Sequence, residues 1–268
     1  MPVLQGIGVL VTRPEQQAMP LCRLLEAEGA GTLRLPAIEI KTIGDRRETL
    51  PRLGALRGFD VIIFTSSNAV RFGASLLDQQ RDLTLVAMGP ATARALNQAG
   101  YRTAGVRPAA APAAPPRGGF DSETLLMHPK LARPAGQRIL IITGSNGRPL
   151  LEQELTRRGA QVVTAEVYQR VPATPSPAVL ASLLESFTEG AVQVITATSL
   201  EIAGSLLGLA TPALRSEFEL VHWLVPGERV AAGVRELGLA APLLSAASAE
   251  DQDLVSALIR WRSSVSGA

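Results

Sequence analysis

Runs of apolar residues alternate with amphipathic stretches along the chain, and this alternation predicts strands followed by helices. Residues 138–144 (RILIITG) form an apolar run, a loop follows, and apolar residues then recur at helical spacing until Gly159. A short apolar run bounded by turn residues is typical of a buried strand, whereas the helical spacing indicates an amphipathic helix. Strands that alternate with helices build parallel sheets covered on both faces. The pattern therefore predicts an α/β protein with parallel sheets.

The same succession of elements occurs more than once in the chain. Three pairs of segments match: 9–40 with 139–170, 59–77 with 192–207, and 88–101 with 226–239. In the first pair, both segments read as strand, loop, helix and strand, and Gly29 or Gly159 ends the helix. In the third pair, Gly89 is matched with Gly227 and Gly100 with Gly238. The matches indicate two similar halves.

The order of the repeats predicts where the domains begin and end. The second half lacks its own first repeat, and the N-terminal residues supply it. We therefore predict two similar α/β domains, of which domain I (1–40 plus 171–268) is discontinuous and domain II comprises 41–170. The two crossings of the chain would form a two-stranded hinge. Residues 108–119 are rich in Pro, Ala and Gly and are expected to form a mobile surface loop, or alternatively a functional lid.

The composition of the 268 residues narrows the class of protein. With 46% hydrophobic and 19% charged residues, the chain can bury a core and is not disordered. Aromatic residues make up 4% and the arginines are dispersed, so no nucleic-acid partner is expected. Cys22, His128 and His222 are too few for a zinc site, and one cysteine allows no internal disulfide. The longest apolar stretch is too interrupted for a membrane span. We predict a cytoplasmic protein without a metal.

The glycine-bearing loop 143–149 (TGSNGRP) lies where nucleotide-binding loops occur, between a predicted strand and a helix. A P-loop needs a Lys followed by Ser or Thr, and this loop has no Lys. A dinucleotide fingerprint needs three glycines at fixed spacing, and only Gly144 and Gly147 are present. The free N–H groups at the start of the following helix still favour an anion. We therefore expect an anion other than a nucleotide.

Polar side chains follow the predicted strands, and in open parallel sheets ligands bind beyond the carboxyl ends of the strands. The alternative reading of each hydroxyl is that it only caps the next helix. Neither His128 nor His222 lies in such a loop, so a Ser-His-Asp triad is not indicated. The candidate binding residues are Arg13, Thr65, Ser66, Asn68, Thr92, Ser122, Gly144, Arg148, Thr198, Ser199 and Arg229.

Tyr168 is a further candidate, in the segment AEVYQRVP where the chain leaves domain II. Its side chain combines apolar bulk with a polar group, so packing at a domain surface is one interpretation. The other interpretation is a phenol donor that helps a leaving group to depart. Residue types alone leave both open.

Taken together, these segments resemble uroporphyrinogen-III synthase. The resemblance rests on the order and spacing of the motifs VLVTRPEQQA, FDVIIFTSSNAVRF, MGPATARAL, FDSETLL, ILIITGSNGRPLLEQELTRRGAQV, VYQRVP and VPGERVAAGVRELG. It implies two flavodoxin-like domains joined by a two-stranded connector. One departure is Val230, where many members of the family have a Thr like Thr92.

The resemblance also implies a reaction. Hydroxymethylbilane, a linear tetrapyrrole, would be dehydrated and cyclised with inversion of ring D, without a cofactor. Tyr168 matches the tyrosine proposed to assist departure of the hydroxyl, and the strand-end residues would hold the acetate and propionate groups of the substrate. We expect a monomer. The alternative is a non-catalytic two-domain binding protein that closes around a small anionic ligand.

Overall fold

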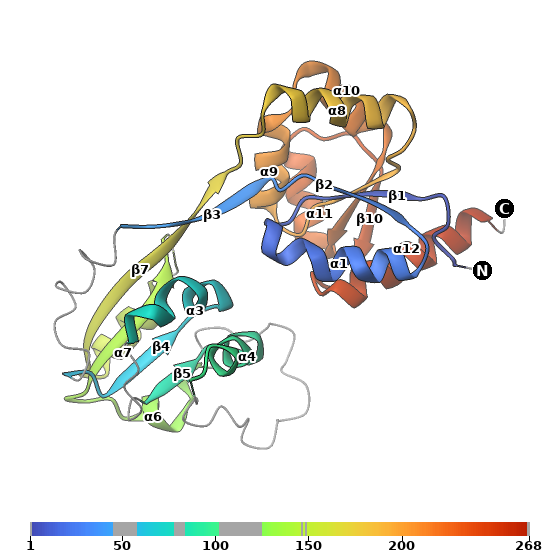
Figure 1. Ribbon diagram of the computed structural model, residues 1–268. Coiled ribbons are helices and arrows are strands. Elements are labelled where there is room, and N and C mark those ends of the chain that lie inside the picture. The colour runs from blue at the N-terminus through green and yellow to red at the C-terminus, as the bar shows by residue number, and fades with distance from the viewer. Residues whose placement is uncertain are drawn as a thin grey trace. The chain divides into compact units, whose positions relative to one another are not determined.

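The computed structural model describes residues 2–44, 58–77, 84–101, 125–145, 147 and 149–266. The chain divides into two compact units (Figure 1). Unit 1 comprises Met1–Glu39 and Val171–Ala268, and unit 2 comprises Ile40–Arg170. Each unit is built around its own five-stranded sheet.

The sheet of unit 1 has the strand order β10-β9-β8-β1-β2, and every neighbouring pair is parallel. Counted along the chain within this unit, the order is 2-1-3-4-5, which is the flavodoxin-like order. The strands are β1 (Gly8–Val11), β2 (Gly31–Arg34), β8 (Val194–Thr196), β9 (His222–Pro226) and β10 (Leu243–Ala246). The helices are α1 (Glu15–Ala27), α8 (Pro177–Thr188), α9 (Leu200–Leu209), α10 (Pro212–Leu220), α11 (Gly227–Glu236) and α12 (Asp251–Ser266).

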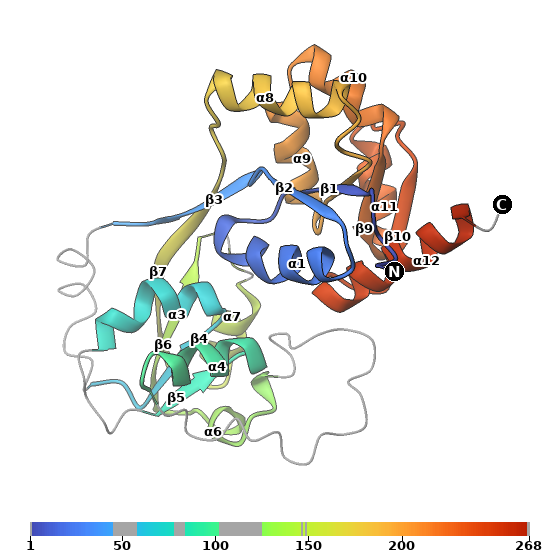
Figure 2. The same ribbon diagram turned by 45° about the vertical axis from the view of Figure 1, so that its right-hand side comes forward.

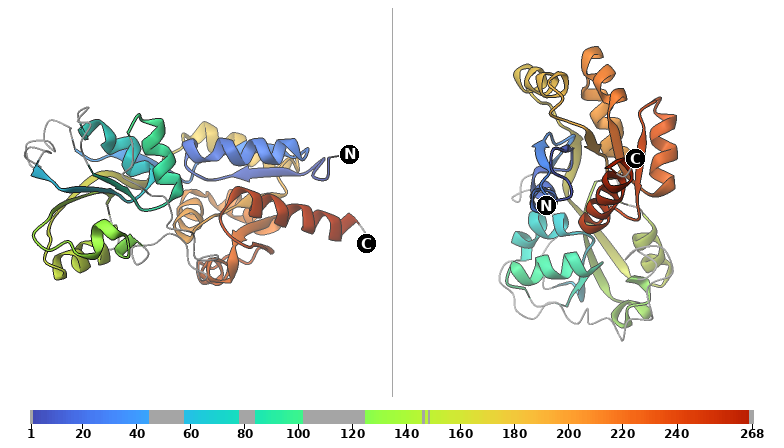
Figure 3. Two further views of the ribbon diagram at one scale, coloured as in Figure 1. Left: turned by 90° about the horizontal axis from the view of Figure 1, so that it is seen from below. Right: turned by 90° about the vertical axis from the view of Figure 1, so that its right-hand side faces the viewer.

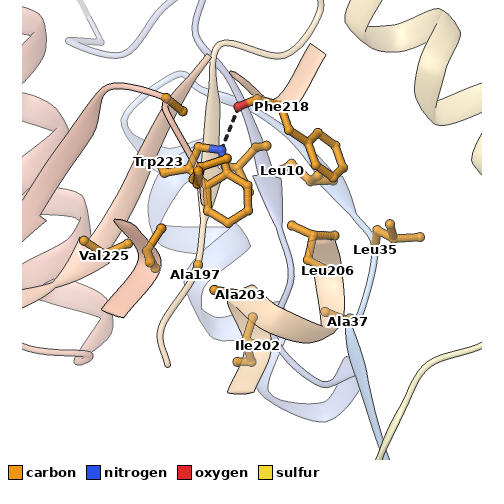
Figure 4. Close-up of a cluster of buried hydrophobic side chains, with 14 of the residues drawn as sticks. Leu10, Leu35, Ala37, Ala197, Ile202, Ala203, Leu206, Phe218, Trp223 and Val225 are labelled. Atoms are coloured by element: carbon orange, nitrogen blue, oxygen red, sulfur yellow. Dashed lines mark hydrogen bonds between the residues drawn. The ribbon is translucent and has the colours of Figure 1, made fainter. Parts of the chain in front are cut away.

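Helices cover both faces of this sheet. Side chains of α8, α9, α10 and α11 pack on one face and those of α1 and α12 on the other. In Figure 2, α8 and α10 lie side by side on the first face, where Phe187 and Phe218 contact each other at 5.4 Å between ring centroids. Trp223 is fully buried in the same cluster, and its indole N–H donates to the carbonyl of Phe218 (2.8 Å, Figure 4). Two apolar layers therefore stabilise unit 1.

Unit 2 repeats this architecture around the strand order β3-β7-β6-β4-β5. Its helices α3 and α4 pack on one face, and α6 and α7 pack on the other (Figure 3, left). The strands are β3 (Ile38–Thr42), β4 (Val61–Phe64), β5 (Leu85–Ala87), β6 (Arg138–Gly144) and β7 (Gln161–Pro172). The helices are α3 (Ser67–Gly73), a 3₁₀ turn η2 (Ala74–Leu77), α4 (Pro90–Gln98), α6 (Pro129–Ala132) and α7 (Leu150–Arg157).

The repeats found in the sequence are confirmed by these two sheets. Matching β6, β7, β4 and β5 with β1, β2, β8 and β9 gives the same spatial order in both units. Gly29 and Gly159, which were predicted to end helices, and the matched pair Gly100 and Gly238 all have a positive φ between 79° and 88°. Only glycine adopts this conformation without strain, which explains its place after each helix. The predicted α/β class with parallel sheets is likewise confirmed.

The chain passes between the units within β3 and β7, which are neighbours in the sheet. The N–H of Ala173 donates to the carbonyl of Ala37 (3.0 Å), and that of Ile43 donates to Val167 (3.2 Å). From the first pair to the second, the residue number rises on one strand and falls on the other, so the two strands run antiparallel. Motion at this pair, as a hinge, stays a prediction. The predicted loop 108–119 lies outside the described residues. None of the described helices is long and apolar enough to cross a membrane.

Candidate functional site

A cavity of about 530 Å³ lies in unit 2 at the carboxyl ends of β4 and β6. These two strands correspond to the first and third strands of the flavodoxin-like order, between which the connections change direction and leave a crevice. Its volume is in the range of small-molecule sites. The lining residues are Thr65, Ser66, Met88, Ile141, Thr143, Gly144, Ser145, Gly147, Pro149, Leu151, Glu152, Thr164, Glu166, Tyr168 and Arg170.

The strand ends bring two threonine hydroxyls together at this cavity. The N–H of Thr65 continues the sheet by donating to the carbonyl of Ile142 (3.1 Å). Its hydroxyl then lies 3.0 Å from that of Thr143, on the neighbouring strand. Sheet pairing between β4 and β6 therefore fixes Thr65, and Thr143 with it, at the rim of the cavity.

Tyr168 enters the site through an irregularity in β7. Thr143 pairs with Glu166 but Gly144 pairs with Tyr168, so Val167 is an extra residue in β7. A bulge of this kind changes the direction of the side chains that follow it and is common next to active sites. Val167 and Tyr168 are consecutive, yet both side chains belong to the apolar cluster on the face of the sheet that α3 and α4 cover. Tyr168 also lines the cavity, so it is both packed in the cluster and present at the site.

Three neighbours fix the position of Tyr168, which is only 6% exposed. Its ring stacks on Phe72 of α3, with centroids 5.8 Å apart and planes 27° from parallel. It also lies against Gly144, where a Cβ would come within 2.5 Å of the phenol carbon Cζ. The phenol oxygen lies 3.0 Å from the hydroxyl of Ser66. The ring of Tyr168 is thus packed within unit 2 and its hydroxyl faces a polar partner, while its role as a phenol donor stays a prediction.

Ser66 is the N-cap of α3. Its backbone is extended (φ −161°, ψ 165°), and its hydroxyl oxygen accepts the N–H of Ala69 (3.0 Å). Ser199 of unit 1 is the matching cap of α9 and accepts the N–H of Ile202 (3.2 Å). The capping interpretation is therefore correct for both serines, and Ser66 carries the contact with Tyr168 in addition.

Charged side chains line one side of the cavity. Thr164, Glu166, Tyr168 and Arg170 occupy alternate positions of β7, and all four line it. Glu152, in the first turn of α7, accepts the hydroxyl of Thr164 (2.8 Å). The predicted set of binding residues omitted Glu152, Glu166 and Arg170. Alternation pairs Thr164 with Glu166 before the bulge at Val167 and Tyr168 with Arg170 after it, and this was the signal that could have found the last two.

Among the predicted binding residues of unit 1, Arg13 and Ser199 have partners within the unit. Arg13, 9% exposed, forms an ion pair with Asp251 and donates to the carbonyl of Ala249. We therefore assign Arg13 to the attachment of the start of α12 and keep it out of the proposed site. Thr198 and Ser199 are half-buried after β8, and Arg229 is exposed on α11.

The remaining predicted residues fall outside the cavity or outside the described chain. Asn68 and Thr92 are buried in the first turns of α3 and α4 and are not among the residues that line the cavity. Ser122 and Arg148 lie outside the described residues. Within the described part of the chain, no cluster of three or more His, Cys, Asp or Glu side chains could hold a metal ion. Burial raises the pKa of the thiol of Cys22, a buried residue of α1 in unit 1.

Fold and site together define a class: an α/β protein with two similar parallel-sheet units and a hydroxyl-lined cavity at the strand ends of unit 2. The family model described as uroporphyrinogen-III synthase HemD matches residues 20–255. The chain belongs to the uroporphyrinogen-III synthase family.

Individual relatives agree with this assignment. The chain is 32% identical to uroporphyrinogen-III synthase of Escherichia coli (strain K12) over 239 residues, with 87% of this chain and 92% of the relative covered. It is 32% identical to that of Salmonella typhimurium over 254 residues, with the same coverage. Among solved structures, uroporphyrinogen-III synthetase from Helicobacter pylori (TM-score 0.58, 15% identity, 95% and 99% covered) shares the fold. So does a mutant uroporphyrinogen III synthase from Thermus thermophilus (TM-score 0.54, 22% identity, 98% and 100% covered).

Proposed function

We propose that this protein is a uroporphyrinogen-III synthase, which cyclises hydroxymethylbilane with loss of water and inversion of ring D. The observation that carries the proposal is the family match over residues 20–255. The site agrees with it, because a packed phenol, threonine and serine hydroxyls and a strand-end cavity occur together in unit 2. This chemistry asks the protein mainly to hold one folded conformation of a linear substrate, which is a proximity and orientation effect.

In the proposed mechanism, Tyr168 assists the first step. The bond between the terminal carbon and its hydroxyl breaks, and the hydroxyl leaves as water with the phenol proton. The carbon that remains is the electrophilic methylene of an azafulvenium cation, whose charge the phenolate balances. The substituted carbon of ring D attacks it to give a spiro intermediate. Fragmentation and reclosure then give the type III isomer. Packing against Phe72 and Gly144 supports this role, because it holds the phenol in one orientation.

The lining of the cavity suits a substrate with two kinds of polar group. The hydroxyls of Thr143 and Ser145 are donors for the acetate and propionate carboxylates, and Thr65 orients the first of them by donating to Thr143 (3.0 Å). The carboxylates of Glu152 and Glu166 repel these groups but accept hydrogen bonds from pyrrole N–H groups. We therefore propose that the substrate presents pyrrole nitrogens toward α7 and β7, and carboxylates toward the hydroxyls.

The decisive experiment is a coupled assay. Hydroxymethylbilane is generated in situ, the protein is added, and the products are oxidised and separated by chromatography. We expect isomer III in excess over a control without the protein, because the uncatalysed reaction closes the ring to isomer I. Formation of isomer I alone would contradict the proposed function and would favour the binding-protein alternative.

Replacement of Tyr168 by Phe tests the role of the phenol. The ring still packs on Phe72 and Gly144, so we expect the melting temperature to change little. Loss of a positioned proton donor typically costs 10²–10⁴-fold in rate, so we expect kcat to fall by roughly 100-fold or more. Steady-state kinetics in the coupled assay and a thermal melt measure the two quantities. Unchanged turnover with an unchanged melt would reduce Tyr168 to a packing residue.

We also propose that the enzyme works as a monomer in the cytoplasm. The single cysteine, Cys22, is buried, which fits a compartment where disulfides are not formed. Light scattering coupled to size-exclusion chromatography would give the mass in solution. A mass of about twice the 28.2 kDa of the chain would contradict the monomer.

A further inference from the structure

The hydroxyl of Ser66 contacts two partners, and these contacts determine where its single proton can be donated. Its oxygen already accepts the N–H of Ala69 as the N-cap of α3 (3.0 Å). Its second contact is the phenol oxygen of Tyr168, also at 3.0 Å. A serine hydroxyl has one proton to donate and two lone pairs. With one lone pair used by the helix, the proton of Ser66 is available to the phenol oxygen.

The proposed reaction decides which of the two oxygens donates. When Tyr168 gives its proton to the departing hydroxyl, the phenol becomes a phenolate, and a phenolate can only accept hydrogen bonds. Ser66 must then be the donor. A hydrogen bond to a charged partner contributes more than one between neutral groups. The contact therefore strengthens as the reaction proceeds, and such an interaction lowers the barrier rather than improving substrate binding.

We propose that Ser66 is a positioning residue that directs the phenol proton of Tyr168 into the cavity and stabilises the phenolate formed there. This inference rests on the proposed function, and it adds a role for Ser66 that acts through Tyr168.

Comparison of the two units shows that the cap does not need a tyrosine. Ser199 caps α9 of unit 1 in the same backbone conformation (φ −158°, ψ 162°). In the matched segments 9–40 and 139–170, the place of Tyr168 is taken in unit 1 by Ile38, a buried residue of the apolar cluster. The fold is thus built with the same serine cap and without a phenol, so the pairing of Ser66 with Tyr168 is an addition specific to unit 2.

A double-mutant cycle separates this role from capping. In the wild-type background, Ser66→Ala is expected to lower kcat by about 10- to 100-fold with little change in KM, because a hydrogen bond to a charged group is lost. In the Tyr168→Phe background, Ser66→Ala is expected to cause no further loss, because no phenolate forms. Ser66→Thr keeps both the cap and the donor and should retain most of the activity.

Two further variants control for the helix cap. Ser176 of unit 1 caps α8 through the N–H of Val179 (3.4 Å) and is exposed. Ser176→Ala therefore removes a serine cap that does not line the cavity of unit 2 and should leave kcat unchanged. Ser66→Asp keeps an acceptor for Ala69 but has no proton to donate at neutral pH, so it should be as slow as Ser66→Ala while remaining folded.

The outcomes distinguish this inference from the proposed function. If the wild-type protein forms only isomer I, the proposed function fails first. If it forms isomer III but the losses from Ser66→Ala and Tyr168→Phe multiply, Ser66 acts independently of the phenol and the inference is wrong. An active Ser66→Asp, or a loss confined to KM, would overturn it as well.

Discussion

Gly144 lies against the ring of Tyr168, where a larger residue has no room. It was predicted as a binding residue because it follows a strand in a glycine-bearing loop, and it does line the cavity. The structure adds a packing reason: a Cβ at this position would come within 2.5 to 2.9 Å of three ring carbons of Tyr168. Its φ is not positive, so the glycine is required by close approach and not by backbone conformation.

Gly144→Ala is therefore expected to displace the phenol. Because the ring also packs against Phe72, it cannot move freely away from the added methyl group. We therefore expect the free energy of unfolding to fall by about 1–3 kcal/mol, as is typical of overpacking. We also expect a fall in kcat, because the hydroxyl leaves the 3.0 Å contact with Ser66. Urea denaturation and the coupled assay measure the two effects. Gly147→Ala is the control, since its Cβ would meet only the hydroxyl of Thr143 at 3.1 Å and an oxygen at 3.5 Å. Equal effects of both substitutions would contradict this account.

At the scale of elements, a glycine with positive φ ends several helices in both units. After α1, the N–H of Gly29 donates to Glu26 (2.9 Å) and that of Ala30 to Leu25 (3.0 Å). These are the two bonds of a Schellman motif, which satisfies carbonyls left free at a helix end. After α8, Gly190 and Ala191 make the corresponding bonds (2.9 and 2.8 Å). The two caps differ only in their surroundings.

Substitution of these glycines separates backbone strain from crowding. Gly190 has φ +69°, and a methyl group on its Cα would meet no other atom within 4 Å, so Gly190→Ala should cost only the strain of about 1–2 kcal/mol. Gly29 has φ +88°, and its Cβ would meet the Cβ of Pro2 at 2.5 Å, so Gly29→Ala should cost more. Chemical denaturation of both variants, followed by tryptophan fluorescence, measures the difference. A larger loss for Gly190→Ala would disprove the ranking.

At the scale of the whole molecule, the aromatic residues divide between the units. Both tryptophans, Trp223 and Trp261, belong to unit 1, and both tyrosines, Tyr101 and Tyr168, belong to unit 2. Tryptophan fluorescence therefore reports on unit 1, whereas circular dichroism reports on both. Each unit has its own pair of apolar clusters. We expect each to respond to damage in its own core.

Leu140→Ala tests this independence. Leu140 is fully buried in β6 of unit 2, and truncation of a buried leucine typically costs about 2–5 kcal/mol. We expect part of the circular dichroism signal to melt at a lower temperature while the tryptophan transition stays where it was. Leu10→Ala, fully buried in β1 of unit 1, is the matched control and should lower the tryptophan transition. Equal shifts of both signals by Leu140→Ala would show one cooperative unit.

The sequence by itself determined the parallel α/β class, the repeats and the helix ends. These features depend on local patterns: apolar runs for buried strands, helical spacing, and glycines such as Gly29 and Gly159 where only a positive φ fits. Ser66 was likewise predictable as a cap, because a serine between a strand and a helix accepts a free N–H group. Each of these signals is contained within a few consecutive residues.

Only the tertiary structure decided which of these residues work together. The contact of Tyr168 with Ser66 joins residues that are far apart in the chain. It also depends on a one-residue bulge at Val167, which no local sequence pattern predicts. Arg13 was predicted from its place after a strand to bind an anion, but the structure gives it Asp251 and Ala249 as partners. Residue type and position after a strand determine which groups a side chain can bind. The register and packing of distant segments determine which of those groups lie close enough to be its partners.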